Sequence, residues 1–288
     1  MPTGTDRTLA ALINLLDEPD EGAFSRIRDQ ILLAGAPAIP ALEKNLEDSF
    51  NELIRERSKQ IIRRLSLENI HHELRNWYAT GGADLLQGFM LVTRTGSPEI
   101  IETDILTRIE QLRLDIWLEL HDQLTALENI RVINHVFFEV HKFQGNRDDL
   151  ADPRYHYLDH MLGTRKGSPI SLAILYLIIA RKLGLPVYGV NLPQHFVLAY
   201  LNNNHIARPG EEDVLFYINP FNRGTVFTRR EIDAFVSQLK IRPEPAFFAP
   251  CSHADIIRRL IAHLIFAHNH TGNDEAVTDH EYIITALE

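Results

Sequence analysis

Apolar residues between residue 9 and about residue 140 recur mostly at intervals of three and four positions, as in Leu9, Leu12, Ile13 and Leu16. Residues at this spacing share one face of an α-helix, so the pattern predicts that the first half of the chain is helical. Glycine, proline and acidic residues interrupt it around residues 17–20, 35–37, 81–82 and 96–98. We expect the helices to end and restart at these points, joined by short links.

The pattern changes after Phe143, where polar residues 144–149 predict a turn. Ser168 and Pro169 are typical of a helix start, and the apolar residues that follow continue to a stop at Gly184. Residues rich in β-branched and aromatic side chains then predict strands at 187–190, 196–201 and 214–218, with an asparagine turn at 202–204. Capping sequences predict further helices after Thr228, Ser252 and Asn273.

The order of these elements predicts an α+β protein with two domains. Residues 1–142 form the predicted helical domain. Residues 143–288 form the second, which comprises one packed core helix, a small antiparallel sheet and a closing pair of helices.

Residues 27–46 differ from the other helical segments, because one predicted helix ends at Gly35 and an alanine-rich helix follows at once. Such a pair can stack closely and resembles a HEAT-type repeat. A second helix pair is predicted at about 55–65 and 70–78. No clean repeat period is visible, so the sequence predicts one or two HEAT-like units rather than a solenoid, with a plain helical bundle as the alternative.

The chain of 288 residues carries 29 basic and 39 acidic residues, a formal net charge of −10. This balance disfavours nucleic acid and anionic membranes as partners, and the arginine pairs, such as Arg258–Arg259, are typical of solvated helix faces. The single cysteine, Cys251, excludes a disulfide within the chain and suits a reducing compartment, so we expect a cytoplasmic protein. Neither a signal-like start nor an apolar run of bilayer length is visible.

Common cofactor motifs are missing from the sequence. The 14 histidines include no His-Glu-x-x-His helix, and neither common glycine-rich phosphate loop occurs, so we expect no metal and no cofactor. Cys251 lies two positions before His253, but residues 250–255 form a predicted capping box, which favours a structural cysteine.

Four short segments occur in order along the second half: residues 143–146 (FQGN), 165–172 (RKGSPISL), 193–196 (PQHF) and 218–221 (INPF). With them the chain resembles the SirB-type branch of the transglutaminase-like superfamily. The resemblance implies a core in which a nucleophilic cysteine begins a helix, a histidine follows on the sheet, and an aspartate or asparagine follows on another strand. His195 and Asn219 match the last two positions, whereas Pro169 occupies the position of the nucleophile.

A cysteine at a helix start is activated by the helix dipole and by a histidine base, but proline has no group that can attack a carbonyl. Further departures from the family pattern are Gln194, where glycine is usual, Asn219 in place of aspartate, and Tyr155–His156 in place of an Asn-Ser pair. The leading hypothesis is therefore a catalytically silent core that binds a protein or peptide partner, with His195, Asn219, Gln194, Phe196 and Gly167 lining the site.

Two alternatives stay open. In the first, the protein is a hydrolase or acyltransferase in which His195 is the base and a displaced serine, Ser168 or Ser171, is the nucleophile. Against it, Ser168 is a predicted helix cap and Ser171 a first-turn residue. In the second, the protein is a scaffold, and His195 merely satisfies a buried hydrogen bond.

Overall fold

The structure, a computed structural model, describes residues 4–202 and 209–288. Its internal contacts divide the chain into two compact units, Met1–Arg75 and Asn76–Glu288. The domain boundary predicted between residues 142 and 143 stays a prediction. Residues 203 and 204 of the predicted asparagine turn lie outside the described residues.

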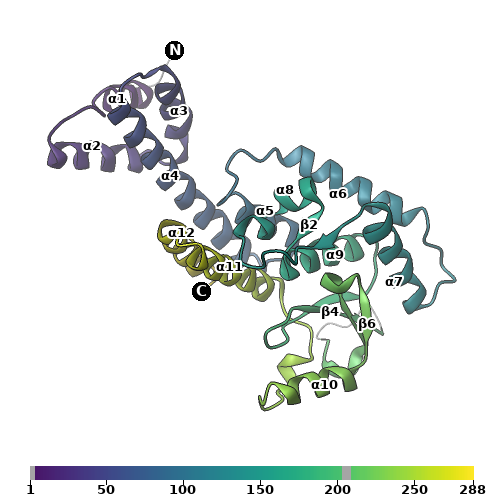
Figure 1. Cartoon of the computed structure of the whole chain (residues 1–288). Helices are drawn as coiled ribbons and strands as arrows, with labels where there is room; N and C mark the ends of the chain where they lie inside the picture. Colours follow the sequence, from purple (N-terminus) through teal and green to yellow (C-terminus); the bar gives the residue numbers. More distant parts are fainter. Residues whose placement is uncertain (1–3, 203–208) are drawn as a thin grey trace. The chain divides into compact units, whose positions relative to one another are not determined.

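Four helices build the first unit, the last of them running past its end: α1 (Gly4–Ile13), α2 (Glu21–Leu33), α3 (Ile39–Asp48) and α4 (Glu52–Ala79) (Figure 1). Their apolar faces meet in one core cluster that consists of Ile13, Leu16, Phe24, Ile31, Ala38, Leu42, Ile61 and Leu65. The predicted pair of helices at 55–65 and 70–78 is wrong, because α4 continues through both segments. Residues 66–69 include no glycine or proline that would break it.

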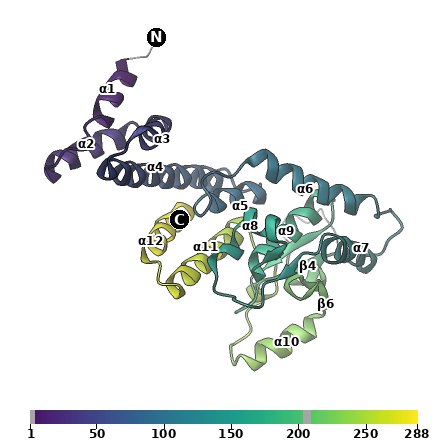
Figure 2. The same cartoon turned by 45° about the horizontal axis from the view of Figure 1, so that its top comes forward.

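The second unit is built around α9 (Pro169–Lys182), the predicted core helix. Every residue from Ile170 to Ala180 is buried, as expected for a helix that is apolar on all sides. Figures 1 and 2 show helices packed about it, and it contacts α5 (Leu85–Thr93), α6 (Glu102–Trp117) and α8 (Leu158–Thr164). The chain reaches α8 from α6 through α7 (Ala126–Asn134) and a π-helix, η2 (His135–Val140).

A four-stranded antiparallel sheet has the order β3 (Val187–Val190), β4 (Val197–Leu201), β5 (Val214–Asn219) and β6 (Thr225–Phe227). It confirms the three predicted strands and adds β6. Helix α9 lies on one face of the sheet and α10 (Arg229–Gln238) on the other (Figures 1 and 2). Val197, Ala199 and Tyr217 pack with Ile232 and Val236 of α10 in the core on that second face.

The chain closes with α11 (His253–His270) and α12 (Asp274–Ile284), the predicted helix pair. A separate parallel pair is formed by β1 (Gln144–Gly145) and β2 (Lys166–Gly167). The remaining short helical turns are η1 (Ala36–Ala38), η3 (Pro153–His156), η4 (Glu211–Asp213), η5 (Pro220–Asn222), η6 (Pro245–Phe247) and η7 (Thr285–Leu287). These elements confirm the predicted α+β class. None of the helices in the described ranges combines the length and apolar character needed to cross a bilayer.

Candidate functional site

The start of α9 is fixed by the parallel pair of β1 and β2. Gly145 pairs with Gly167, and the amide of Asn146 donates to the carbonyl oxygen of Gly167 at 2.9 Å. A Cβ atom on Gly167 would lie 2.8 Å from the hydroxyl of Ser171 and 2.7 Å from the sulfur of Met161. Only glycine fits there, so the residues that begin α9 are held closely against β2.

Ser168 and Ser171 are both buried and are engaged in hydrogen bonds with each other. Ser168 caps α9, since its Oγ accepts from the amide of Ser171 at 3.3 Å and donates to the Ser171 Oγ at 3.1 Å. The Ser171 Oγ in turn lies 2.7 Å from the carbonyl oxygen of Tyr155, to which it donates. The amide of Ser168 donates to the same oxygen at 2.9 Å. Neither hydroxyl is presented to solvent as a nucleophile must be.

Pro169, expected from the resemblance to occupy the position of the nucleophile, is the first residue of α9 and is partly buried. Its ring suits this place because the first helical residue needs no backbone donor. The helix therefore starts as predicted, with a side chain that cannot form a covalent intermediate.

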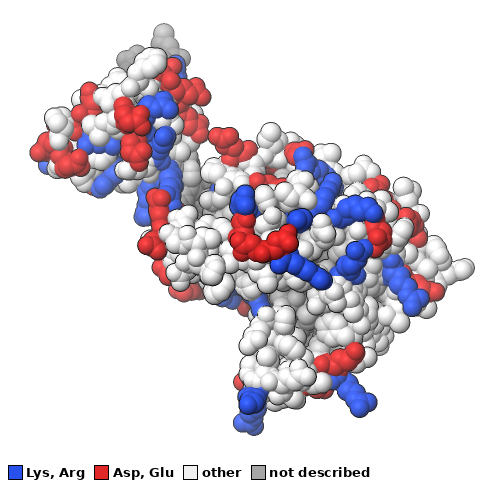
Figure 3. Space-filling view, viewed as in Figure 1, with Lys and Arg blue, Asp and Glu red and all other residues white. Residues whose placement is uncertain are grey.

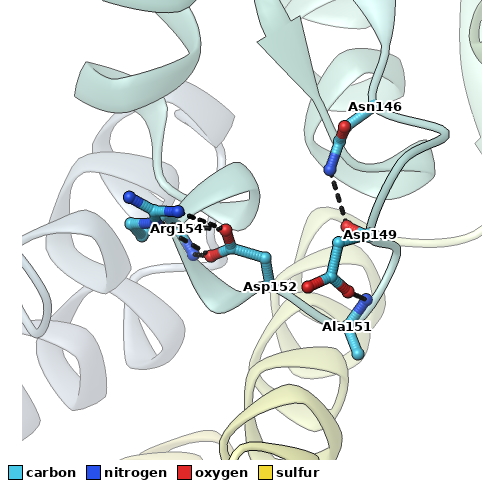
Figure 4. Close-up of polar contacts among 5 residues, drawn as sticks. All are labelled: Asn146, Asp149, Ala151, Asp152 and Arg154. Carbon is cyan, nitrogen blue, oxygen red and sulfur yellow. Dashed lines mark hydrogen bonds and ion pairs between the residues drawn. The ribbon is translucent and has the colours of Figure 1, made fainter.

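The segment from Asn146 to Arg154 leads to η3 and satisfies many of its own polar groups (Figure 4). The Asn146 side-chain amide donates to the carbonyl oxygen of Asp149 at 2.6 Å, and the Asp149 carboxylate accepts from the amide of Ala151 at 3.0 Å. Arg154 pairs with Asp152 at 2.7 Å, and its hydrogen bond lowers the pKa of that carboxyl group. These local bonds define the segment that brings Tyr155 to the start of α9.

His195 and Gln194 lie in the loop between β3 and β4 and are both exposed. The prediction that His195 belongs to a strand is wrong, because β4 begins at Val197. The cause is a turn at residues 193–194, where Gln194 adopts a left-handed φ of 61°. Phe196 is buried, and a Cβ atom on Gly189 would lie 2.7 Å from its ring.

The imidazole of His195 packs edge-on against Phe235 of α10, with ring centroids 4.9 Å apart. Partial desolvation by the surrounding protein, followed by the positive charge of Arg259, holds the pKa of His195 below its usual value although the residue is exposed. In the described part of the chain, the ring makes no hydrogen bond to Ser168, Ser171 or Asn219. The alternative that His195 satisfies a buried hydrogen bond is also wrong, since the side chain is exposed.

Asn219 ends β5, as predicted, and its side chain caps η5 by accepting from the amide of Asn222 at 3.2 Å. The short helix η5 contacts α9, and its Phe221 ring fills the space that a side chain on Gly145 would need. Asn219 therefore lies near the start of α9, with its amide oxygen engaged locally. The assigned roles of His195, Asn219, Gln194, Phe196 and Gly167 stay predictions.

Cys251 is attached to the edge of the sheet, where its amide donates to the carbonyl oxygen of Gly189 at 2.9 Å. Burial, and then the charge of Asp255, raise the pKa of its thiol to about 12. His253 directs its Nδ1 to the carbonyl oxygen of Gly82 at 3.0 Å. The predicted capping box is confirmed, with Ser252 and Asp255 as its members. The thiol is therefore not activated.

Two groups in this region, the carbonyl oxygen of Tyr155 and the side chain of Arg259, were not predicted from the sequence. The carbonyl oxygen of Tyr155 is a backbone atom, and no residue type encodes its position. Arg259 belongs to a pair interpreted as solvated, yet it is partly buried beside the loop that carries His195. Its spacing from Ile256 and His263 places it at the edge of the apolar face of α11, which is a readable signal. Across the described residues, no three His, Cys, Asp or Glu side chains gather in a way that could hold a metal ion.

Several known proteins are similar in sequence to this chain. F-box only protein 21 of Homo sapiens is 31% identical over 144 residues, which cover 50% of this chain and 22% of that protein. A UPF0162 protein of Xylella fastidiosa strain 9a5c is 26% identical over 196 residues, or 62% of this chain and 63% of the relative. A UPF0162 protein of Vibrio cholerae is 28% identical over 160 residues, or 53% of each chain.

The chain thus spans less than two thirds of each of these relatives, and about a fifth of the F-box protein. No solved structure matches it. The sequence model of one family matches residues 103–262, more than half of the chain, and includes the start of α9, the four-stranded sheet and most of α11. On this match, the protein belongs to the transglutaminase-like superfamily.

Proposed function

We propose that the core of this protein binds a polypeptide segment and performs no acyl transfer through a cysteine or serine. The observation that carries the proposal is the start of α9, where Pro169 stands at the position that the resemblance gives to the nucleophile and both nearby serines are buried and hydrogen-bonded. The thiol of Cys251, with a pKa of about 12, offers no substitute. A covalent mechanism needs an accessible nucleophile beside a base, and these side chains do not supply one.

The loop between β3 and β4 supports a binding role. Gln194 and His195 are exposed polar side chains on a loop anchored by the buried ring of Phe196. Exposed loop residues held by a rigid scaffold are frequent binding elements. On the face seen in Figure 3, the part of the second unit that holds β4, β6 and α10 is largely uncharged. Such a surface suits a polypeptide better than a polyanion.

We further propose that the helical unit of α1 to α4, with its HEAT-like helix pair, presents a second surface to a protein partner in the cytoplasm. Helix pairs that stack in this way commonly form extended binding surfaces. This proposal rests on the HEAT-like helix pair predicted from the sequence. It holds whether or not the core is catalytic.

The catalytic half of the proposal is tested by labelling the purified protein with thiol- and hydroxyl-directed acylating probes, read by intact mass. We expect no adduct in the wild-type protein under native conditions. An adduct mapped to Ser168 or Ser171 and lost in His195→Ala would overturn the proposal and establish a hydrolase or acyltransferase with His195 as base. Ser237→Ala, which removes an exposed hydroxyl on α10, serves as the control variant.

The binding half is tested by selecting a displayed peptide library on the folded protein. We expect enriched peptides whose affinity falls in Gln194→Ala and His195→Ala but is kept in Arg230→Gln, an exposed change on α10. Absence of enrichment, or affinity indifferent to the loop variants, would contradict a binding role for this loop. Circular dichroism of each variant establishes that the fold is retained.

A further inference from the structure

Arg259 of α11 lies beneath the loop that carries His195. Its Nη1 donates to the side-chain oxygen of Asn191 and, at 3.0 Å, to the carbonyl oxygen of Leu192. The guanidinium carbon lies 5.8 Å from the centroid of the Phe196 ring. Arg259 therefore fastens the β3 side of the loop to the helix through one of its nitrogens, and its guanidinium faces the ring of Phe196 on the other side.

The charge of Arg259 is not balanced by a neighbouring acid. Within the described residues no carboxylate lies at ion-pair distance from it, whereas its neighbour Arg258 pairs with Asp255 at 2.8 Å. The Nε and Nη2 atoms of Arg259 make no hydrogen bond there, and the side chain is partly buried. In a protein of net charge −10, a partly buried and uncompensated guanidinium is unusual, since buried charges are generally paired.

Three titratable groups around it carry no negative charge, and the carboxylate one turn earlier on α11, Asp255, is paired with Arg258. The positive charge of Arg259 lowers the pKa values of His195 and His263, in each case after the effect of burial. The thiol of Cys251, also near Arg259, stays protonated because its pKa is raised to about 12. The surroundings of the loop thus comprise one fixed cation and neutral imidazole groups, one of which, His195, is exposed.

We infer that Arg259 and His195 form a carboxylate-binding site, which selects polypeptide ligands that present an acidic side chain or a free C-terminus to the loop. The free Nε and Nη2 donors are arranged as the fork that binds a carboxylate with two hydrogen bonds. A neutral imidazole can donate a third from its protonated nitrogen. This inference rests on the proposed peptide binding and deepens it by naming the recognised group.

The test is an NMR titration of the full chain carrying labelled histidine, followed at the ring signals of His195. The probes are three short peptides: acetyl-Ala-Ala-Ala with a free carboxylate, acetyl-Ala-Glu-Ala-amide and acetyl-Ala-Gln-Ala-amide. We expect the His195 signals to shift when one or both of the carboxylate peptides are added. The Kd for the uncharged peptide should be at least about tenfold higher. The first two probes distinguish a C-terminal from a side-chain carboxylate.

Arg259→Gln keeps a donor for the loop but removes the charge, and we expect it to weaken carboxylate binding by about tenfold or more. Arg230→Gln removes a charge from an exposed site on α10 and should retain binding. Equal binding of the uncharged peptide would overturn the carboxylate inference while leaving peptide binding intact. Retained binding in Arg259→Gln, or no response to any probe, would also overturn the inference.

Discussion

The hydroxyl of Ser171 donates a hydrogen bond across 2.7 Å to the backbone carbonyl oxygen of Tyr155, a residue sixteen positions earlier in the chain. The amide of Ser168 donates to the same oxygen, so one carbonyl ties the segment before α8 to the start of the core helix. The two serines at the start of α9 are therefore held in hydrogen bonds that link it to the segment before α8.

Ser171→Ala should lower the free energy of unfolding by about 1 kcal/mol, the usual worth of a buried hydrogen bond. Urea denaturation monitored by circular dichroism measures the change. Ser237→Ala is the matched control, because Ser237 donates to the carbonyl oxygen of Asp233 on an exposed face of α10. We expect little change in that variant. Equal losses of unfolding free energy in the two variants would show that the Ser171 bond to Tyr155 contributes no more to stability than the exposed Ser237 bond.

Gly224→Ala should destabilise the protein by about 2 kcal/mol or more, because two costs add. Gly224 has a left-handed φ of 70°, and its added Cβ would collide with the Asn134 side chain. That side chain donates to the Gly224 carbonyl oxygen at 3.0 Å and accepts from the Tyr176 hydroxyl at 2.9 Å.

The matched control for this substitution is Gly272→Ala. Gly272 has the same φ of 70°, but a Cβ there meets no atom within 4 Å. It should therefore show the backbone cost alone, about 1 kcal/mol. If thermal or urea unfolding gave equal losses of unfolding free energy for the two variants, the collision with Asn134 would add nothing to the cost of the substitution.

Cys251 should react with iodoacetamide about a thousandfold more slowly in the folded protein than in the unfolded chain at pH 8. The reason is its pKa of about 12, which burial and the charge of Asp255 raise from 9.0 and which leaves almost no thiolate. Mass spectrometry with and without guanidinium measures the two rates. Rapid alkylation of the folded protein would contradict the structure's burial of the thiol.

Stability should fall as the pH is lowered from about 6.5 to about 4. Burial lowers the pKa values of His156 and His263 to about 4, with further contributions from His263 and Arg259 respectively. Between the unfolded value of 6.5 and 4 the unfolded chain binds the extra protons, so each histidine adds a slope of up to about 1.4 kcal/mol per pH unit.

Urea titrations across this range measure the slope. His156→Gln should flatten it, whereas His121→Gln should not, because His121 is exposed. A slope that is identical in the wild-type protein and in His156→Gln would show that His156 is charged, or solvated, in the folded state.

Local rules of hydrogen bonding account for the elements that the sequence predicts well. The capping sequences at Ser168, Thr228, Ser252 and Asn273 all begin helices in the structure. Each depends on residues within three positions of one another, so a single sequence contains all the information that the cap needs. The strands 187–190 and 214–218 follow from equally local composition.

Features that depend on distant contacts were not predictable in the same way. The strand expected from residue 196 begins one residue later, at Val197, and Phe196 just before it packs beside Gly189. The acceptor for Ser171 is a backbone carbonyl, which leaves no trace in the residue type of Tyr155. The helical spacing of Arg259 indicates that it lies at the edge of an apolar face, but the hydrogen-bond partners Asn191 and Leu192 come from a distant loop and could not be predicted from the sequence.

The burial of α9 on all sides has a consequence for synthesis of the protein. Its covering elements include β3, η5 and α11, all of which follow it in the chain. In a nascent chain that has left the ribosome only as far as residue 182, α5, α6 and α8 have emerged, but the part of the apolar run 170–180 that the sheet and α11 cover is still exposed. Until α11 has emerged, this run is the segment of the core that most needs a chaperone.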